Sequence, residues 1–466
     1  MPVAPPRLRD ARTDRAVPLR VRGWFTSRPH PQFGLRPTVR FVIAFSLTTG
    51  WVAFAVWASG PWRSDLEDAL GPVMAWVIPT LLAYIPSLVI GLMAFTLIIT
   101  RYREPSSVTG WPDVTVMVAA WNEEEAIVPT LERIATLEYA GHVEVVLADN
   151  NSTDRTAELA EATASRLGLD YRRVFEPTPG KHRALNAALA SVRTSVVATV
   201  DADTFLQREA LKRLIARLLD APQDQHVAAC AGALIADNPL ANGVTRMQQW
   251  DYRLGINGVK RMQAAYNSAL VAQGAFSTYW TDDVRAVGGW PDAIGEDILL
   301  TWAMMSKPGV VQYEPVAVGF TTVPEKLGQL LSQRSRWARG MFEGLRIHPP
   351  PKQPRVLAKL VASIDYLVPL LDIGLVFFFL PGVILLAFGY PLIVGWWSIL
   401  LLPLTLTIFG SIRWWQERHV FRRLNINPGR DARGFIGYLA IYPFLTSAAA
   451  LRGYGQYLLG ATRRWK

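Results

Sequence analysis

Two long apolar runs near the beginning of the chain constrain its fold most strongly. Residues 41–59 and 72–100 are each long enough to cross a lipid bilayer as a helix. The short connection between the two runs is acidic, whereas the flanks outside the pair are basic. Because flanks rich in lysine and arginine remain on the cytoplasmic side, we expect both flanks to be cytoplasmic. The sequence thus predicts a multi-pass protein of the plasma membrane, with the lipid bilayer as a partner.

Apolar runs return towards the end of the chain, at residues 364–388, 392–412 and 435–451. They predict about three C-terminal membrane segments, and Pro443 in the last run leaves open whether that run spans the membrane or re-enters it. Asp365 and Asp372 lie in or beside the first of these runs, where ionisable groups usually face a bundle interior or a wet cavity. We expect Asp372 either to line a hydrophilic path or to pair with a neighbouring helix.

The region between the two sets of apolar runs alternates short apolar stretches with amphipathic ones. The apolar stretches predict strands at residues 114–118, 143–148, 195–200 and 227–234, and the amphipathic ones predict helices at 123–138, 154–167, 183–193 and 208–219. This alternation predicts an α/β domain with a mostly parallel sheet and helices on both faces. Ligands of such sheets bind beyond the carboxyl ends of the strands. Polar residues follow three of the predicted strands: Asn122 and Glu123, Asp149, and Asp201 with Asp203.

Charge and composition argue against a nucleic-acid-binding protein and against a disulfide-stabilised one. The net charge is +10, but the basic residues cluster beside the apolar runs rather than in a patch with interleaved aromatic residues. Anionic lipid headgroups and an anionic substrate account for them better than a nucleic acid. The single cysteine, Cys230, lies in an apolar run and excludes an intrachain disulfide. The six histidines form no cluster with the spacing of metal ligands.

The aspartates that follow two of these strands could bind a ligand, but helix capping could also explain part of each pattern. Asp201 and Asp203 suit a hard divalent cation that itself holds phosphate oxygens, although Asp203 could instead cap the following helix. Asp149 precedes a tight turn, Asn-Asn-Ser-Thr-Asp, in which Ser152 or Asp154 caps a helix. Capping does not require Asp149, so we expect its carboxylate to be free for a ligand such as a pyrimidine edge.

Three further segments carry residues suited to an anionic substrate. Gly180 and Lys181 open a predicted helix and make an anion-binding turn, unless the turn is merely a solvated basic one. Glu296 and Asp297 open another predicted helix. There they are either stabilised by the helix dipole, or one of them acts as a general base. Gln333, Arg336 and Trp337 lie on one face of the amphipathic segment 327–347. Arginine suits a diphosphate and tryptophan a sugar ring; the alternative is an interfacial helix at headgroup depth.

The order and spacing of these motifs resemble the membrane-embedded inverting glycosyltransferases of family 2, which include hyaluronan, chitin, cellulose and poly-N-acetylglucosamine synthases. The resemblance covers about residues 114–340, roughly half of the chain. It rests on Ala-Trp-Asn-Glu-Glu at 120–124, Asp149, Gly180-Lys181, Asp201-Ala-Asp203, Gln273-Gly274, Gly288-Gly-Trp290, Glu296-Asp297 and Gln333-Arg-Ser-Arg-Trp337. Gly295 stands where the family usually has threonine, and Trp280 stands where a basic residue is frequent. Trp280 leaves the acceptor and the donor sugar open.

The resemblance implies a GT-A fold and a nucleotide-sugar donor, usually UDP-linked. It implies that Asp201 and Asp203 bind the nucleotide and Mg2+ or Mn2+, with Asp203 as the direct ligand. Asp297, beside Glu296, would deprotonate the acceptor hydroxyl in a single displacement with inversion. The remaining implied donor residues are Asn122, Glu123, Asp149, Lys181, Gln333 and Arg336, and the implied acceptor residues are Trp337 and Gly274.

The expected organisation places a cytoplasmic catalytic domain between membrane segments. We expect a basic disordered tail at residues 1–40, two transmembrane helices at 41–100, the GT-A domain at 104–326, amphipathic interface helices at 327–362, and about three membrane segments at 363–466. The expected function is the polymerisation of N-acetylglucosamine or glucose into a β-linked polysaccharide that leaves through the membrane helices. The alternatives are a transferase that adds one sugar to a lipid, and a transporter or scaffold with a degenerate nucleotide-binding domain. The sequence does not predict the oligomeric state.

Overall fold

A computed structural model describes residues 35–106, 108, 110–221, 225–307, 309–427 and 431–460. Most of the predicted basic tail therefore lies outside the described residues. The side chains of residues 396–405 also lie outside the description. Residues 36–466 form one compact unit.

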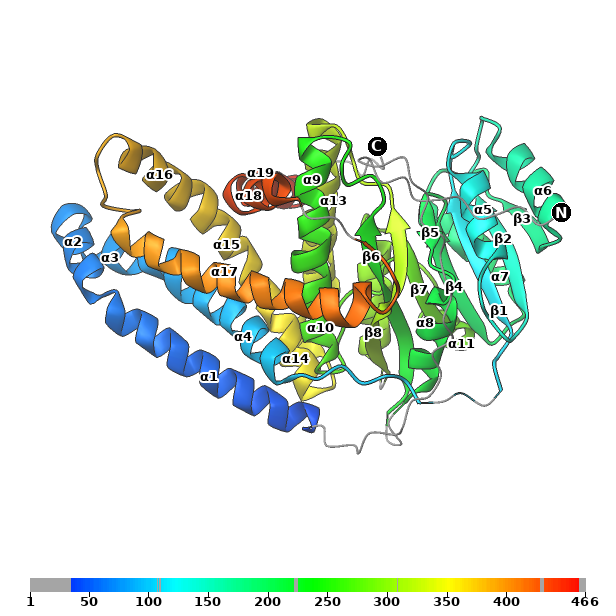
Figure 1. Ribbon diagram of the computed structural model, residues 1–466, viewed down its shortest axis with the longest axis horizontal. Helices are drawn as coiled ribbons and strands as arrows, with labels where there is room; N and C mark the ends of the chain where they lie inside the picture. Colours follow the sequence, from blue (N-terminus) through cyan, green and yellow to red (C-terminus); the bar gives the residue numbers. More distant parts are fainter. Residues whose placement is uncertain are drawn as a thin grey trace. The chain divides into compact units, whose positions relative to one another are not determined.

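The central region folds into an eight-stranded mixed sheet with the order β3-β2-β1-β4-β7-β6-β8-β5 (Figure 1). Strands β3, β2, β1 and β4 are parallel to one another, β7 is antiparallel to both β4 and β6, β8 is parallel to β6, and β5 is antiparallel to β8. The predicted parallel sheet is thus confirmed only for one half. The strand bounds are β1 Val114–Ala120, β2 Val143–Asp149, β3 Asp170–Phe175, β4 Val196–Asp201, β5 Thr204–Leu206, β6 Val227–Ala236, β7 Phe276–Trp280 and β8 Val310–Thr321.

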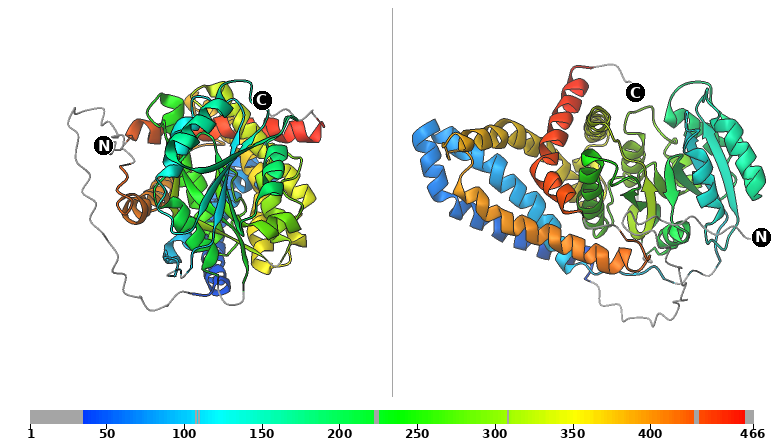
Figure 2. Two further views of the ribbon diagram at one scale, coloured as in Figure 1. Left: turned by 90° about the vertical axis from the view of Figure 1, so that its right-hand side faces the viewer. Right: turned by 45° about the horizontal axis from the view of Figure 1, so that its top comes forward.

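Helices cover both faces of this sheet, as the alternating pattern predicts (Figure 2). The apolar sides of α5 (Ile127–Ala135) and α8 (Ala210–Leu219) contribute to the hydrophobic core on one face. Those of α7 (Lys181–Ser191) and α12 (Glu296–Met305) contribute to the core on the other face. Helix α5 is shorter than predicted at both ends. Its predicted first turn is a loop that bonds to the loop before α6 (Thr156–Leu167).

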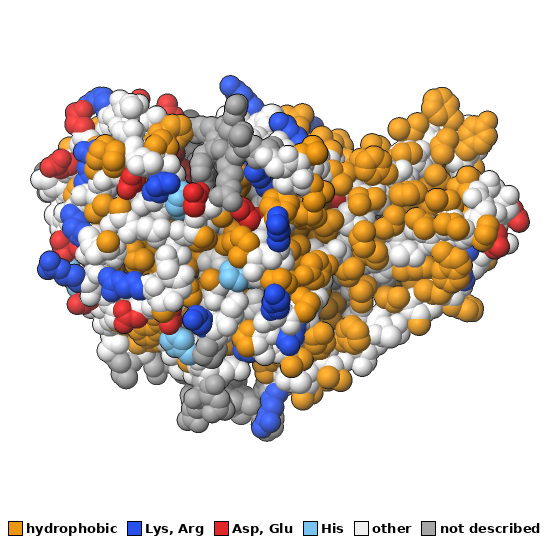
Figure 3. Space-filling view, turned by 180° about the vertical axis from the view of Figure 1, so that it is seen from behind, with side chains coloured by type: hydrophobic (Ala, Val, Ile, Leu, Met, Phe, Trp, Pro, Cys, Tyr) orange, Lys and Arg blue, Asp and Glu red, His pale blue; other side chains and the backbone are white. Residues whose placement is uncertain are grey.

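The described chain contains three helical stretches that are long and apolar enough to cross a membrane: α1 (Pro37–Ala58), Pro72–Ile99 and Val356–Ala387. The second stretch consists of α3 (Pro72–Pro79), a π-helical turn and α4 (Ile85–Ile99), and α4 packs along α1. Apolar side chains gather over these helices, whereas charged ones gather over the region of the sheet (Figure 3). A further helix, α17 (Trp396–Gln416), follows the third stretch.

The last two helices form a bent pair. Helices α18 (Ala432–Ala440) and α19 (Tyr442–Leu458) meet at an angle of 46°, and Pro443 is the second residue of the second helix. This geometry suits both a broken span and a re-entrant segment, so the predicted alternatives both stand. Asp372 on α15 (Val368–Gly374) accepts hydrogen bonds from two hydroxyls of α19, Ser447 Oγ at 2.6 Å and Tyr454 Oη at 2.7 Å. Asp372 therefore pairs two helices, one of the two predicted alternatives.

Helix α13 (Leu327–Ile347) has the bounds that the amphipathic pattern predicts. It packs on α12 of the sheet region and on α19. This position matters for function because α13 carries Gln333, Arg336 and Trp337, whereas α12 begins with Glu296 and Asp297. The fold thus places the two predicted motifs on neighbouring helices.

Candidate functional site

The carboxyl ends of three neighbouring strands bring the predicted polar residues to one edge of the sheet. In the parallel register, Ala120 of β1 lies opposite Asp149 of β2, and Ala119 lies opposite Asp201 of β4. Asn122 and Glu123 follow β1 after one intervening residue, Trp121. The loop ends of these strands therefore meet where ligands of such sheets bind.

The carboxylate of Asp149 is not free, contrary to the expectation from the sequence. It is fully buried, and its Oδ2 accepts a hydrogen bond from Nε of Arg173 at 2.9 Å. Its Oδ1 accepts from the backbone N–H of Ser152 at 3.0 Å. Arg173 lies on β3, a strand that the sequence analysis missed because its six residues show neither an apolar run nor a regular alternation of polar and apolar side chains. Its guanidinium also lies 5.2 Å from the ring of the half-exposed Phe175.

Asn122 and Glu123 join the loop after β1 to the loop after β2. Asn122 adopts a positive φ of 55°, which asparagine tolerates better than most residues, and its Oδ1 accepts from the backbone N–H of Thr153 at 2.8 Å. The backbone N–H of Glu123 donates to Thr156 Oγ1 at 2.7 Å. The side chain of Asn122 thus has a structural task that the sequence did not reveal.

Lys181 and the two aspartates after β4 form the centre of the site. Lys181 is the first residue of α7, and its Nζ donates to Oδ1 of Asp201. Asp203 lies two residues further on, in the turn between β4 and β5. Burial and the neighbouring carboxylate of Asp201 raise the pKa of Asp203 to about 6, although Lys181 opposes the shift. The turn therefore holds two close carboxylates with one cation beside them.

Glu296 and Asp297 reach this centre from the first turn of α12. Asp297 Oδ2 accepts from the backbone N–H of Gly274 at 3.2 Å, and its Oδ1 accepts from the N–H of Ile298 at 2.8 Å. Glu296 is buried, and burial together with the charge of Asp297 raises its pKa to about 8. Both carboxylates interact electrostatically with Lys181. A Cβ at Gly274 would lie 3.1 Å from Lys181 Nζ, so a side chain there would crowd the lysine.

Helix α13 completes the site from the opposite side. Arg336 lies within the electrostatic reach of Glu296, and burial lowers the pKa of its guanidinium. The buried Oε1 of Gln333 has no hydrogen-bond partner in the part of the chain that the structure describes. Trp337 leaves 41% of its surface exposed, and the guanidinium carbon of Arg334 lies 4.1 Å from the centre of its ring.

The approach of α13 to α12 depends on two glycines. A Cβ at Gly295 would lie 2.9 Å from Cα of Gly340, and a Cβ at Gly340 would lie 2.9 Å from Cα of Gly295. A side chain at either position would push the helices apart and move Arg336 away from Glu296. The departure of Gly295 from the expected threonine therefore has a steric reason.

Tyr252 is a site residue that the sequence analysis missed. It lies on the π-helical turn η2 (Asp251–Ile256), is buried, and is close enough to Asp203 and Asp201 to interact with their charges. Burial, Asp251 and these two carboxylates raise the pKa of its hydroxyl to about 12, whereas Arg334 lowers it. No sequence motif marks Tyr252, since only the fold brings it to the turn after β4.

The donor set of this site fits a divalent cation only in part. Among the described residues, no group of three or more His, Cys, Asp or Glu side chains is arranged to hold a metal ion. Asp201 and Asp203 supply two carboxylates, and hard cations take six or more oxygen ligands. The pair therefore fits a cation that receives its other ligands from phosphate oxygens and water.

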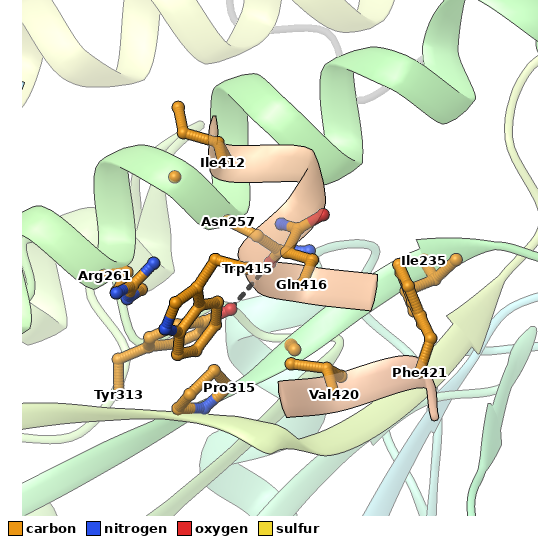
Figure 4. Close-up of a pocket in the computed structure, with 12 residues that line it drawn as sticks. Ile235, Asn257, Arg261, Tyr313, Pro315, Ile412, Trp415, Gln416, Val420 and Phe421 are labelled. Atoms are coloured by element: carbon orange, nitrogen blue, oxygen red, sulfur yellow. Dashed lines mark hydrogen bonds between the residues drawn. The ribbon is translucent and has the colours of Figure 1, made fainter. Parts of the chain in front are cut away.

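A small cavity elsewhere is separate from this site. It has a volume of about 20 Å3, enough for one water molecule, and lies between α10 (Asn257–Ala264), α17 and β8 (Figure 4). Tyr313 Oη donates to Asn257 Oδ1 at 3.0 Å at its wall. None of the predicted site residues lines it.

Known proteins resemble this chain in sequence over about half of its length. Residues 112–340 match the model of the family described as "Glycosyltransferase like family 2". An N-acetylglucosaminyltransferase of Mesorhizobium japonicum is 31% identical over 252 residues, which cover 51% of this chain and 58% of the relative. A poly-beta-1,6-N-acetyl-D-glucosamine synthase of Staphylococcus aureus is 30% identical over 236 residues, which cover 50% of this chain and 55% of the relative. The chain thus spans about half the length of the curated relatives that it matches.

A solved structure shares the fold. The mannosyltransferase PcManGT from Pyrobaculum calidifontis, solved in complex with GDP-Man and Mn2+, superposes with a TM-score of 0.57 at 20% identity. The similarity covers 83% of this chain and 99% of that chain. At this identity the likeness shows the fold alone.

Proposed function

Residues 112–340 form a glycosyltransferase family 2 domain of GT-A type, and we propose that the chain uses it to transfer a sugar from a UDP-sugar to a growing β-linked polysaccharide. N-acetylglucosamine is the first candidate for the sugar, because both relatives named above carry that sugar in their names, and glucose is the second. One observation carries the proposal: the carboxylates of Asp201 and Asp203 share Lys181 with the acid pair Glu296 and Asp297.

The donor side of the proposal rests on this shared lysine. Asp201 and Asp203 would hold Mg2+ or Mn2+, which would supply charge stabilisation for the departing diphosphate. Lys181 and Arg336, which both interact electrostatically with Glu296, would neutralise the diphosphate from two sides. Asp149, already fixed by Arg173, would lie next to the nucleobase together with the loop of Asn122 and Glu123.

The acceptor side rests on Asp297. Backbone N–H groups of Gly274 and Ile298 donate to both of its oxygens and fix the direction of the carboxylate, as the position of a base requires. Asp297 would accept the proton of the acceptor hydroxyl, which attacks from the face opposite the departing nucleotide, so the configuration inverts. Glu296, whose pKa of about 8 keeps it protonated at neutral pH, would donate a hydrogen bond rather than act as the base.

The acceptor sugar would lie between Gly274 and Trp337. The exposed face of the Trp337 indole offers an apolar platform for a sugar ring. The unpartnered Oε1 of Gln333 would accept a hydrogen bond from a sugar hydroxyl, and the side-chain amide nitrogen of Gln333 would donate to the diphosphate.

The membrane part of the proposal follows from the apolar helices. The stretches within residues 41–100 and 363–466 would span the bilayer of the plasma membrane, with the catalytic domain of residues 104–326 on the cytoplasmic side and the amphipathic helices of 327–362 at the interface. Polymer would leave between the membrane helices.

One observation favours a second candidate, the transfer of a single sugar to a lipid. An apolar groove of about 340 Å3 lies beside α13, lined by Phe342, Leu345, Tyr366, Pro369 and Tyr457, with Arg346 among its lining residues. A hydrocarbon chain with an anionic headgroup matches such a groove.

Purified protein in detergent, supplied with a panel of UDP-sugars, tests the proposal. We expect UDP release with one sugar in the presence of Mg2+ or Mn2+, loss of release with a chelator, and a long product on a gel. Asp203→Asn should abolish release, whereas Asp282→Asn, whose carboxylate is 95% exposed, should not. A product with a single sugar on lipid would favour the second candidate. No release with any nucleotide sugar would refute both.

A further inference from the structure

A buried ion pair supports one face of Trp337. Arg334, one turn before Trp337 on α13, is buried, and its Nη2 lies 2.9 Å from Oδ2 of Asp251. The guanidinium carbon of Arg334 lies 4.1 Å from the centre of the Trp337 ring. Stacking of a guanidinium on an indole is attractive, so the arginine covers one face of the ring and leaves the other open.

Asp251 is itself held firmly. Its Oδ2 also accepts from Oη of Tyr442, at 3.0 Å, and Tyr442 is the first residue of α19. A Cβ at Gly255 would lie 2.7 Å from Oδ1 of Asp251, so the glycine leaves room for the carboxylate. A buried ion pair contributes little net stability compared with apolar residues of similar size. Its most useful contribution here is a fixed direction for the guanidinium.

The same π-helical turn reaches the donor side. Asp251 and Tyr252 are consecutive residues of η2, and Tyr252 lies beside Asp201 and Asp203. Single π-helical turns occur frequently at functional sites. One turn of the backbone therefore contacts both the residues that would hold the nucleotide and the arginine under Trp337.

We propose that Asp251 is a positioning residue which, through Arg334, fixes the indole plane of Trp337 as the platform for the acceptor sugar, at a set distance from the donor carboxylates. This inference rests on the proposed function for the identity of the ligand. The support of the ring by the ion pair does not depend on it. Without the charged carboxylate, the guanidinium loses its ionic partner and keeps only the weaker contact with Tyr442, so the half-exposed indole can change rotamer.

Kinetics with an oligosaccharide acceptor test the positioning. Asp251→Asn keeps the shape of the side chain and an oxygen for Tyr442 but removes the charge. We expect KM for the acceptor to rise about threefold to tenfold, with little change in UDP release without acceptor. Arg334→Lys keeps the charge but not the planar group and should act in the same direction. In a Trp337→Ala background, Asp251→Asn should add no further loss, because its effect passes through the ring.

Oxidative footprinting supplies a readout that needs no activity. Trp337 and Trp121 are both 41% exposed, so Trp121 is a matched internal control. Hydroxyl-radical oxidation of Trp337 should rise at least twofold in Asp251→Asn, while oxidation of Trp121 stays constant. Unchanged oxidation of Trp337, or a full additional loss in the Trp337→Ala background, would overturn the inference. If the wild type releases no nucleotide but the footprint changes as expected, the proposed function fails and the positioning stands.

Discussion

Replacement of Glu296 by glutamine is expected to stabilise the protein. Burial and the charge of Asp297 raise the pKa of Glu296 from 4.5 to about 8. Between these two values the folded protein keeps a proton that the unfolded chain has released, so the free energy of unfolding falls as the pH rises. The penalty is absent below about pH 4.5, grows up to about pH 8 and stays constant above that value.

The size of the effect follows from the same pKa. At pH 7, which is about 2.5 units above the ordinary glutamate pKa of 4.5, Glu296 stays protonated in the folded protein but is ionised in the unfolded chain. This difference lowers the free energy of unfolding by at most about 3 kcal/mol. Glutamine has nearly the same shape and cannot ionise, so Glu296→Gln should remove most of this penalty and raise Tm by several degrees. The more stable Glu296→Gln variant should also turn over more slowly, because proteins keep destabilising groups at positions where catalysis needs them.

Thermal unfolding in detergent, followed by intrinsic fluorescence at about pH 5, 7 and 8.5, measures the effect. The difference in Tm between Glu296→Gln and the wild type should be small at the lowest pH and largest at the highest. Glu161→Gln is the matched control, because Glu161 is exposed on α6 and makes the same chemical change outside the site. A difference that is the same at all three pH values, or a variant that is less stable at pH 8.5, would refute the reasoning.

Three further predictions concern the site and the membrane helices. Lys181→Met should weaken UDP binding about fivefold to thirtyfold, since it removes a charge-assisted hydrogen bond in a partly exposed position; exposed Lys307→Met is the control in the same calorimetric titration. Asp297→Asn should leave UDP affinity within about threefold but lower turnover at least about 100-fold, whereas Asp203→Asn should weaken metal-dependent UDP binding. A loss of affinity in Asp297→Asn equal to that in Asp203→Asn would exclude Asp297 as the base. Asp372→Leu should lower the free energy of unfolding by about 2 kcal/mol, because two hydroxyls lose their acceptor; normal product export in this variant would exclude Asp372 from a polymer path.

The sequence predicts the elements that carry continuous patterns and misses those that do not. Strands β1, β2, β4 and β6 consist mostly of apolar residues, and all four were predicted. Strand β8 was missed because Gln312, Glu314 and Pro315 interrupt its apolar residues, although most of the strand is buried. Strand β7 was missed because Ser277 and Thr278 occupy buried positions where the pattern expects apolar side chains. Of the strands beyond β4 in the sheet, only β6 was predicted, so the antiparallel pairings of β7 and β5 are known only from the structure.

The candidate site shows the same division. Strand ends and helix starts could be located by pattern, so the acidic residues at these positions were named from the sequence, whereas Asp251 on the π-helical turn was not. Their partners could not, because a partner is a neighbour in space rather than in sequence. Arg173 on β3 contacts Asp149 on the neighbouring parallel strand β2. Gly295 contacts Gly340, which lies 45 residues later in the sequence. From the sequence pattern alone, the carboxylate of Asp149 was therefore expected to be free, and the glycine at position 295 had no structural explanation.

The shifts in the site reflect both low solvation and an excess of negative charge. Burial is the largest cause of the raised pKa values of Asp203 and Glu296, and it also lowers the pKa of Lys260 to about 7 against the attraction of Asp297. At Lys181, by contrast, the carboxylates of Asp201, Glu296 and Asp297 outweigh burial and raise the pKa of the ammonium group. In such surroundings each interaction between charges is stronger than in water. The departing diphosphate would thus meet Lys181 and any bound cation where they stabilise developing charge most effectively.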